Sequence, residues 1–330
     1  MSMLTDDERA RRDDMAASES AGISAGDQGV ATLLAAGRGT HGKTSYESNA
    51  DVQRWLQEQA LEEGGTRGAF TPTFLAHQRD RLWVLSSLRH FYEERLIADV
   101  LAVAKSGKEA NVYCCAADPA TGAEYLAAKV YRPRMFRNLK NDAVYRRGRA
   151  QLDERGREVR GPRVWRGANR DTERGRAAQV ASWIQYEFQT QRLLYEAGAD
   201  VPGPVAQIGN AELMEFIGQG TEAAPALREV TLDREEARGV FDRILRNVEL
   251  ALACDRVHGD LSAYNVLYHA GAPVIIDFAQ AVDPRYSPEA GDLLARDVER
   301  ICRHFARYGV EADAAALAAD LWERYLRGEV

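Results

Sequence analysis

Three polar side chains in the C-terminal half of the chain have the types and spacing that phosphoryl transfer requires. Asp260 and Asn265 lie five residues apart in the segment HGDLSAYN, and Asp277 follows two apolar residues in the segment IIDF. Phosphoryl transfer needs a carboxylate that orients the attacking hydroxyl and accepts its proton, and oxygen ligands that hold Mg²⁺ against the phosphates. Asp260 suits the first role, and Asn265 and Asp277 suit the second. An isolated Asp in a loop is usually a turn or cap residue, but these spacings together favour phosphoryl transfer.

A glycine-containing segment and a strand lysine supply a second candidate site. Residues 106–113, SGKEANVY, lie between two expected strands, and backbone N–H groups in such a loop can surround phosphates. A single glycine is a weak signal, because a plain hairpin has the same pattern. Lys129 strengthens it, because a lysine between apolar residues on a half-buried strand needs an anionic partner. The phosphates of ATP and a glutamate on a helix would be such partners.

Two further segments complete the candidate nucleotide site. Glu187, in the helical segment SWIQYEF, is the candidate partner of Lys129, although the sequence alone favours an exposed helix glutamate at this position. Met214, Glu215 and Ile217 lie at the end of an apolar strand, in a segment with the character of a linker between two lobes. The backbone of this linker would pair with adenine.

The elements that must position these residues follow from the periodicity of the apolar side chains. A three- and four-residue spacing predicts a helix over residues 74–100, and a change of period predicts three short strands between there and residue 131. Tight turns join these strands, which favours an antiparallel sheet. The later expected elements are a helix around Trp183 and Leu194, strands at 204–209 and 211–218, a helix over 233–256, a β-hairpin over 266–276 and a helical tail from Asp292.

Five segments in this order, GKEANVY, AAKVY, LMEFIG, VHGDLSAYN and IIDFAQAV, resemble the RIO family of atypical serine/threonine protein kinases. The chain is more similar to the RIO1-type branch, in a form like that of bacterial members, because no winged-helix pattern precedes the core. The resemblance implies an α+β, protein-kinase-like bilobal fold with an antiparallel sheet in the N-lobe and a short, mostly helical C-lobe. The expected divisions are a largely disordered leader over 1–73 with room for a short helix, an N-lobe over 74–216 and a truncated C-lobe over 217–330.

The same resemblance implies a role for each candidate residue. Asp260 would be the catalytic aspartate, Lys129 would contact the ATP phosphates and pair with Glu187, and Asn265 and Asp277 would hold Mg²⁺, with Mn²⁺ as an alternative ion. The residues that would cover or frame the nucleotide are Ser106, Gly107, Lys108, Glu109, Val112, Lys129, Met214, Glu215 and Ile217. The expected activity is ATP-dependent phosphorylation of serine or threonine, or ATP hydrolysis. Family members with known roles act in the maturation of the small ribosomal subunit, and the protein substrate is not specified by the resemblance.

Composition and charge argue against several classes of protein. The chain has 330 residues, 45% of them apolar, and a net charge of −7, which argues against a collagen-like, disulfide-scaffold or general polyanion-binding protein.

The charge is unevenly spread, because residues 132–176 carry 15 Lys or Arg and 6 Asp or Glu. We expect this segment to be a flexible basic loop that contacts RNA or a ribosomal subunit, or that folds against the acidic remainder of the chain. It contains no Ser and only Thr172, which argues against the loop autophosphorylation that is frequent in the family.

The cysteines and the apolar runs indicate a compartment. The chain has four cysteines, none of them in a CxxC pair, which indicates reduced, packed thiols. The N-terminus lacks the apolar core of a signal peptide, and no apolar run is long enough to span a bilayer. We therefore expect a cytoplasmic protein without a membrane partner.

Two alternative functions stay open at the level of the sequence. A small-molecule phosphotransferase of the aminoglycoside or choline kinase kind shares the HGD, Asn and IDF pattern, although GKEANVY and the mere 53 residues after Asp277 count against it. A nucleotide-sensing factor that binds RNA or the ribosome without catalysis would use the basic loop over 132–176.

Overall fold

The computed structural model describes residues 69–74, 81–107, 109–132 and 173–330. These residues belong to the second of the two units into which the chain divides, Thr44–Val330, and the first unit, Met1–Lys43, lies outside the described residues. Most of the predicted leader, most of the predicted basic loop and Lys108 also lie outside them. The lobe boundaries at residues 73 and 216 stay predictions.

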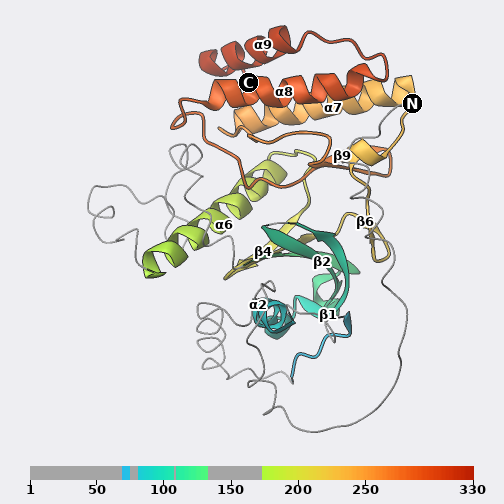
Figure 1. The fold of residues 1–330 in the computed structure, drawn as a ribbon, viewed down its shortest axis with the longest axis vertical. Coiled ribbons are helices and arrows are strands. Elements are labelled where there is room, and N and C mark those ends of the chain that lie inside the picture. Colours follow the sequence, from blue (N-terminus) through green and yellow to red (C-terminus); the bar gives the residue numbers. More distant parts are fainter. Residues whose placement is uncertain (1–68, 75–80, 108, 133–172) are drawn as a thin grey trace, which may run out of the picture. The chain divides into compact units, whose positions relative to one another are not determined.

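An antiparallel sheet of five strands, in the order β1-β2-β3-β5-β4, forms the N-terminal part of the fold (Figure 1). The strands are β1 (Ile97–Ser106), β2 (Ala110–Ala117), β3 (Tyr125–Tyr131), β4 (Pro204–Ile208) and β5 (Ala211–Glu215). β2 and β3 pair without a register shift, whereas β1 pairs with β2 through three shifts. The prediction of an antiparallel sheet is confirmed, and the strands predicted at 204–209 and 211–218 are β4 and β5.

The two faces of this sheet carry different kinds of side chain. On β3 and β5, Ala128 and Leu213 point to one face and pack in a core with α2 (Arg81–Glu93). Because side chains alternate along a strand, Lys129 and Glu212 point to the opposite face. They lie opposite each other in the register of β3 and β5. The alternation therefore directs a lysine and a glutamate away from the α2 core.

The helix predicted over residues 74–100 is shorter in the structure, because β1 already begins at Ile97. Arg95 adopts a left-handed φ of 59°, and the N–H of Leu96 donates to the carbonyl of Phe91 (2.9 Å), which ends the helix. Ile97 is fully buried, like the apolar face of α2. The apolar spacing thus continues across the junction and hides it in the sequence.

Helix α6 (Glu173–Glu196) lies along the other face of the sheet and contacts β4 and β5. It begins inside the segment predicted as the basic loop, since residues 173–176 are helical. The ring of Trp183 packs edge-on against that of Tyr131 (5.4 Å between centroids), and its Nε1–H donates to the carbonyl of Ala279 (3.1 Å). Through Trp183, α6 links the sheet to the segment that follows Asp277.

Three helices form most of the C-terminal part, and α8 contacts both of the others (Figure 1). They are α7 (Arg234–Ala253), α8 (Ala290–Ala306) and α9 (Ala314–Arg327). Phe241 and Phe305 meet edge to face in their common core, with ring centroids 5.5 Å apart. The predicted helix over 233–256 is α7, and the predicted helical tail is α8 and α9, which separate at Gly309.

A β-hairpin precedes Asp277, as the sequence predicts. It consists of β8 (Val266–His269) and β9 (Ala272–Ile275). The remaining described elements are short: β6 (Gly218–Gln219), β7 (Glu222–Ala223), and the 3₁₀ turns η3 (Pro119–Thr121) and η5 (Leu227–Glu229). The α+β architecture, a sheet followed by a mostly helical part, is confirmed. No helix within the described ranges is long and apolar enough to cross a membrane.

Candidate active site

A cleft of about 360 Å³ lies between the sheet and the β8–β9 hairpin. Lys129 contributes to it from β3, Glu187 from α6, and Leu267 from β8. The predicted site residues that line it are Gly107, Glu109, Val112, Lys129, Glu187, Met214, Glu215, Ile217 and Asp277. Ser106, Asp260 and Asn265 lie outside this lining. A volume of this size is typical of small-molecule sites, so one cleft brings most of the predicted nucleotide-contacting residues together.

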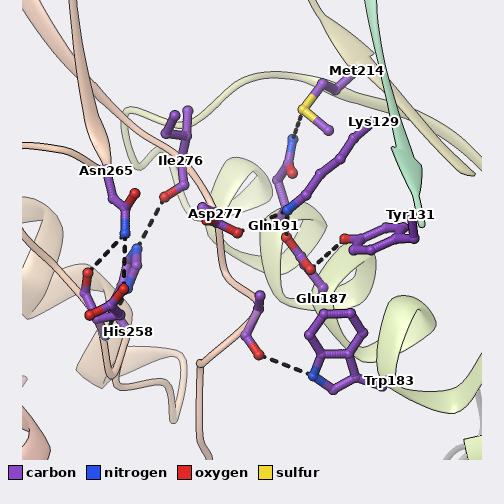
Figure 2. A network of polar contacts seen from close by, with 12 residues as sticks. Lys129, Tyr131, Trp183, Glu187, Gln191, Met214, His258, Asn265, Ile276 and Asp277 are labelled. Atoms are coloured by element: carbon purple, nitrogen blue, oxygen red, sulfur yellow. Dashed lines mark hydrogen bonds and ion pairs between the residues drawn. The ribbon is translucent and has the colours of Figure 1, made fainter. Parts of the chain in front are cut away.

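Lys129 stands between two carboxylates in the cleft (Figure 2). Its ammonium donates to Glu187 Oε1 and to Asp277 Oδ1, the latter at 2.9 Å. The side chain of Glu187 is 3% exposed and that of Lys129 13%, so their ion pair is shielded from water. Glu187 is thus not the exposed helix glutamate that the sequence alone favours, because α6 presents it to the sheet.

Burial and charge act against each other around Lys129. Burial alone would lower the pKa of its ammonium, but Asp277 and Glu187 together raise that pKa above its usual range, so the lysine stays protonated. The charge of Lys129 lowers the pKa of Asp277 below its ordinary value and keeps this carboxylate ionised. Burial raises the pKa of Glu187, and the ammonium of Lys129 opposes that shift.

Asp277 is set in place by the hairpin that precedes it. The N–H of Ile276 donates to the backbone carbonyl of Asn265 (2.9 Å), which closes the hairpin just before Asp277. Asp277 itself adopts a φ of 70°, a left-handed conformation that costs a non-glycine residue about 1–2 kcal/mol. Such strain is typical of functional positions, where the surrounding structure over-determines the backbone.

The loop that carries Asp260 is held by α8. Asp297, which is 1% exposed, accepts hydrogen bonds from the N–H groups of Gly259 (2.7 Å) and Leu261 (3.0 Å). Burial raises the pKa of Asp297 to about 6. Asn265 Nδ2 donates to the backbone carbonyl of Asp260 (3.0 Å). With its backbone fixed on both sides, Asp260 presents a side chain that is 49% exposed.

The predicted phosphate-covering loop closes as a tight hairpin between β1 and β2. The N–H of Gly107 donates to the carbonyl of Ala110 (2.9 Å), and a Cβ on Gly107 would lie 2.9 Å from the same oxygen. Ser106 Oγ donates to Asn111 Oδ1 (3.0 Å). The N–H of Gly107 therefore serves the hairpin, and Glu109 and Gly107 reach the cleft while Ser106 does not.

Comparison with known proteins assigns a family to this arrangement. A family model described as the RIO domain matches residues 111–317. This chain belongs to the RIO domain family. The match extends from β2 into α9, and it confirms the resemblance seen in the five sequence segments.

Several curated relatives carry RIO names. The RIO-type serine/threonine-protein kinase Rio1 of Haloferax volcanii is 31% identical over 64% of this chain and 65% of the relative. Its namesake in Thermoplasma acidophilum is 33% identical over 41% of this chain and 69% of the relative. The serine/threonine-protein kinase RIO1 of Caenorhabditis elegans is 31% identical over 62% of this chain and 37% of the relative. The chain thus spans less than two thirds of the Haloferax and Caenorhabditis relatives that it matches.

Among solved structures, the chain is similar to the Rio2 kinase of Chaetomium thermophilum. The crystal structure of the ADP/Mg²⁺-phosphoaspartate complex of that kinase has 18% sequence identity and a TM-score of 0.43, over 85% of this chain and 96% of the other. A second crystal structure of the same kinase has 20% identity and the same TM-score.

Two residues close to the ion pair of Lys129 were not predicted from the sequence. The hydroxyl of Tyr131 donates to Glu187 Oε2, so Tyr131 holds the second oxygen of the glutamate that pairs with Lys129 (Figure 2). Tyr131 lies two residues after Lys129 on β3, so strand alternation places both on one face. That alternation was a usable signal.

Glu212 is the second missed residue. It is fully buried, and neither of its carboxylate oxygens has a hydrogen-bond partner among the described residues. Burial raises its pKa well above the ordinary value, and the nearby charge of Glu187 raises it further. Burial thus favours the protonated form of Glu212 beside the ion pair of Lys129.

Proposed function

We propose that this chain is a RIO-type, ATP- and Mg²⁺-dependent phosphotransferase that acts as a serine/threonine protein kinase or an ATPase. The observation that carries the proposal is the cleft in which Lys129, Glu187 and Asp277 meet, next to the loop of Asp260 and Asn265. The names of the curated relatives, RIO-type serine/threonine-protein kinases, support the same activity.

The sheet side of the cleft suits a nucleoside triphosphate. Met214 and Glu215, the last two residues of β5, and Ile217 just after the strand line the cleft and would frame the adenine. Lys129 stays charged and would contact the phosphates, and Glu187 holds its ammonium in place. A fixed cation in a partly desolvated cleft binds phosphate more strongly than it would in water.

Asp277 and Asn265 fit a magnesium site. Asp277 is ionised because Lys129 lowers its pKa, and Asn265 uses its amide nitrogen on Asp260, which leaves the amide oxygen for a cation. Within the described ranges, no group of three or more His, Cys, Asp or Glu side chains could hold a metal ion alone. Phosphate oxygens and water would complete the coordination, as is usual for Mg²⁺, and the ion would neutralise the charge that develops on the phosphates.

Asp260 would orient the acceptor and take its proton. Its carboxylate is exposed on a loop whose backbone is fixed by Asp297 and Asn265. The acceptor is a serine or threonine hydroxyl for the kinase activity and a water molecule for the ATPase activity. Action on the small ribosomal subunit, RNA contact through the basic loop, use of Mn²⁺ and a cytoplasmic location stay predictions, and the loop over 133–172 lies outside the described residues.

The test measures ATP turnover and Mg-ATP binding of the parent protein, Asp260→Ala and Asp277→Ala. We expect Asp260→Ala to lose at least about 100-fold in turnover, the usual contribution of a positioned acid–base group. Asp277→Ala should also lose most of its turnover, because it removes a proposed magnesium ligand. Arg303→Met, an exposed position on α8, serves as the control and keeps parental turnover. Parental rates in both aspartate variants would refute the proposal. Nucleotide binding by a parent that never turns ATP over would instead favour the nucleotide-sensing alternative.

A further inference from the structure

Three side chains of α8 contact the loop that carries Asp260. Asp297 accepts from two backbone N–H groups of the loop, and Arg296 donates to the backbone carbonyl of Gly259. One turn later, Arg300 donates from its Nη1 nitrogen to Asp260 Oδ1 at 2.7 Å. Residues four apart share one face of a helix, so Arg296 and Arg300 reach the same loop. Arg300 thus acts on the carboxylate itself, whereas its neighbours act on the backbone.

The two oxygens of Asp260 differ in their surroundings. Oδ1 accepts a hydrogen bond from the guanidinium of Arg300. Oδ2 lies 3.4 Å from Asn265 Nδ2, a distance that is long for a hydrogen bond. The side chain of Asp260 is 49% exposed, so packing alone does not fix its rotamer. Arg300 is 34% exposed, and a charge-assisted bond to it is the strongest restraint that the structure gives the carboxylate.

We propose that Arg300 is a positioning residue, which holds Asp260 so that Oδ2 faces the acceptor hydroxyl on the side of Asn265. This inference rests on the proposed phosphotransferase function. It adds a residue from α8, forty positions from Asp260 in sequence, to the catalytic arrangement.

The chemistry explains why a fixed rotamer matters. In the transfer step, the acceptor oxygen forms a bond to the γ-phosphorus of ATP and its proton passes to Asp260 Oδ2. The bond from that phosphorus to the β,γ-bridging oxygen breaks, and ADP leaves with the electron pair. A carboxylate that rotates freely would face the hydroxyl for only part of the time, and misplacement of about 1 Å can cost up to about 100-fold in rate.

The experiment compares Arg300→Met with Arg300→Lys and the matched control Arg303→Met. Methionine keeps most of the apolar stem and removes every donor, and Arg303 is 71% exposed and pairs with Glu299 rather than with the loop. We expect Arg300→Met to lower kcat by about tenfold while the Kd for Mg-ATP changes less than about twofold. Arg300→Lys, which keeps the charge with a single donor group, should recover part of the loss. Arg303→Met should match the parent.

The outcomes separate this inference from the proposed function. If the parent turns ATP over and Arg300→Met has the kcat of Arg303→Met, Arg300 does not position Asp260 and the inference is wrong. An increase in the Kd for Mg-ATP with an unchanged kcat would also overturn it, because that result assigns Arg300 to nucleotide binding. A parent without any turnover refutes the proposed function and, with it, the positioning role. Thermal unfolding checks that each variant is folded. If Arg300→Met is not folded, the kcat of Arg300→Lys decides the question. We expect that kcat to be lower than that of the parent, and a parental value would contradict the inference.

Discussion

At the scale of residues, Lys129 is surrounded by more acid than base. Three carboxyl groups, those of Glu187, Asp277 and Glu212, act on the single ammonium of Lys129. Asp277 and Glu187 are bonded to it, whereas Glu212 lies opposite it in the β3–β5 register with no hydrogen-bond partner among the described residues. Because burial raises the pKa of Glu212 and a third negative charge would compete for the lysine, the arrangement favours the protonated form of Glu212.

The protonation of Glu212 predicts a pH-dependent stability. Its pKa is raised by burial in the folded protein, so the folded state keeps a proton that the unfolded chain releases. The free energy of unfolding should therefore fall as the pH rises from the ordinary glutamate range through the raised folded-state pKa. Glu212→Gln, which has the shape of the neutral acid, should equal the parent at pH 4 and exceed it by on the order of 1 kcal/mol at pH 8.

Urea unfolding at both pH values checks this prediction. The exposed Glu222 of β7 provides the control, because Glu222→Gln removes the same charge from a position in contact with water. If Glu212→Gln loses stability between pH 4 and pH 8 as steeply as the parent does, Glu212 is not the buried proton carrier.

The ion pair of Lys129 and Glu187 predicts that two substitutions near it differ in the size of their effects. Glu187→Gln removes the charge that draws Lys129 toward α6, so the ammonium should turn to Asp277. We expect a loss of about 2 kcal/mol in stability, since the remaining partner limits the usual cost of breaking a buried pair, and at least a tenfold fall in ATP turnover. Tyr131→Phe removes only one hydrogen bond to Glu187 and should cost about 1 kcal/mol. Equal effects of the two variants on turnover would contradict this assignment.

At the scale of elements, the anchoring of the Asp260 loop by α8 decides how the site responds to pH. The pKa of Asp297 is raised to about 6, so it accepts hydrogen bonds from Gly259 and Leu261 as a carboxylate above that pH and gains a proton below it. His258 and Arg296 are the charged or titratable groups that act on Asp297 most strongly, and both favour the carboxylate.

The expected consequence is an acid limb in the pH dependence of kcat. As the pH falls through about 6, Asp297 becomes a weaker acceptor and the loop loosens, so kcat should decline. Asp297→Asn, which cannot ionise, should lower kcat at pH 8 by about tenfold and flatten this limb. Steady-state turnover from pH 5 to pH 8 tests it, and an acid limb of parental shape in Asp297→Asn would show that another group is responsible.

The elements also explain how much of the structure the sequence predicts. Strand alternation is local, so it predicts β2, β3 and β5 and the cleft-facing direction of Lys129. The loop spacing of Asp260, Asn265 and the hairpin before Asp277 is local in the same way. The burial of Glu187 depends on how α6 packs against β3, whose Lys129 lies 58 residues away in sequence, and no local pattern encodes that. Likewise, the pairing of Arg300 with Asp260 spans 40 residues.

The buried carboxylate of Asp297 can be recognised from the sequence of its own helix, α8. Asp297 lies among the apolar residues Leu294, Val298 and Ile301 on the buried face of α8. A lone carboxylate within such a stripe predicts a polar partner, because a buried charge needs one. The junction of α2 and β1 shows the opposite case, where continuous apolar residues hide a change of element.

At the scale of the whole molecule, the site combines side chains from two parts of the fold that lie far apart in the sequence. Lys129 comes from the sheet, Asp277 from the segment after the hairpin, and Trp183 on α6 contacts both Tyr131 and Ala279. Charge is also unevenly divided along the chain, because residues 132–176 are basic and the remainder is acidic. The proposed nucleotide would lie where the sheet and the hairpin face each other, and the acceptor would lie at the loop of Asp260.

The most direct test of this account separates binding from transfer in Asp260→Asn. Asparagine keeps the shape of the side chain but cannot take the proton of the acceptor. Mg-ATP affinity should change less than about twofold, because Asp260 does not line the cleft, while phosphate transfer or release should fall at least about 100-fold. Turnover in Asp260→Asn equal to that of the parent would contradict the account at its centre.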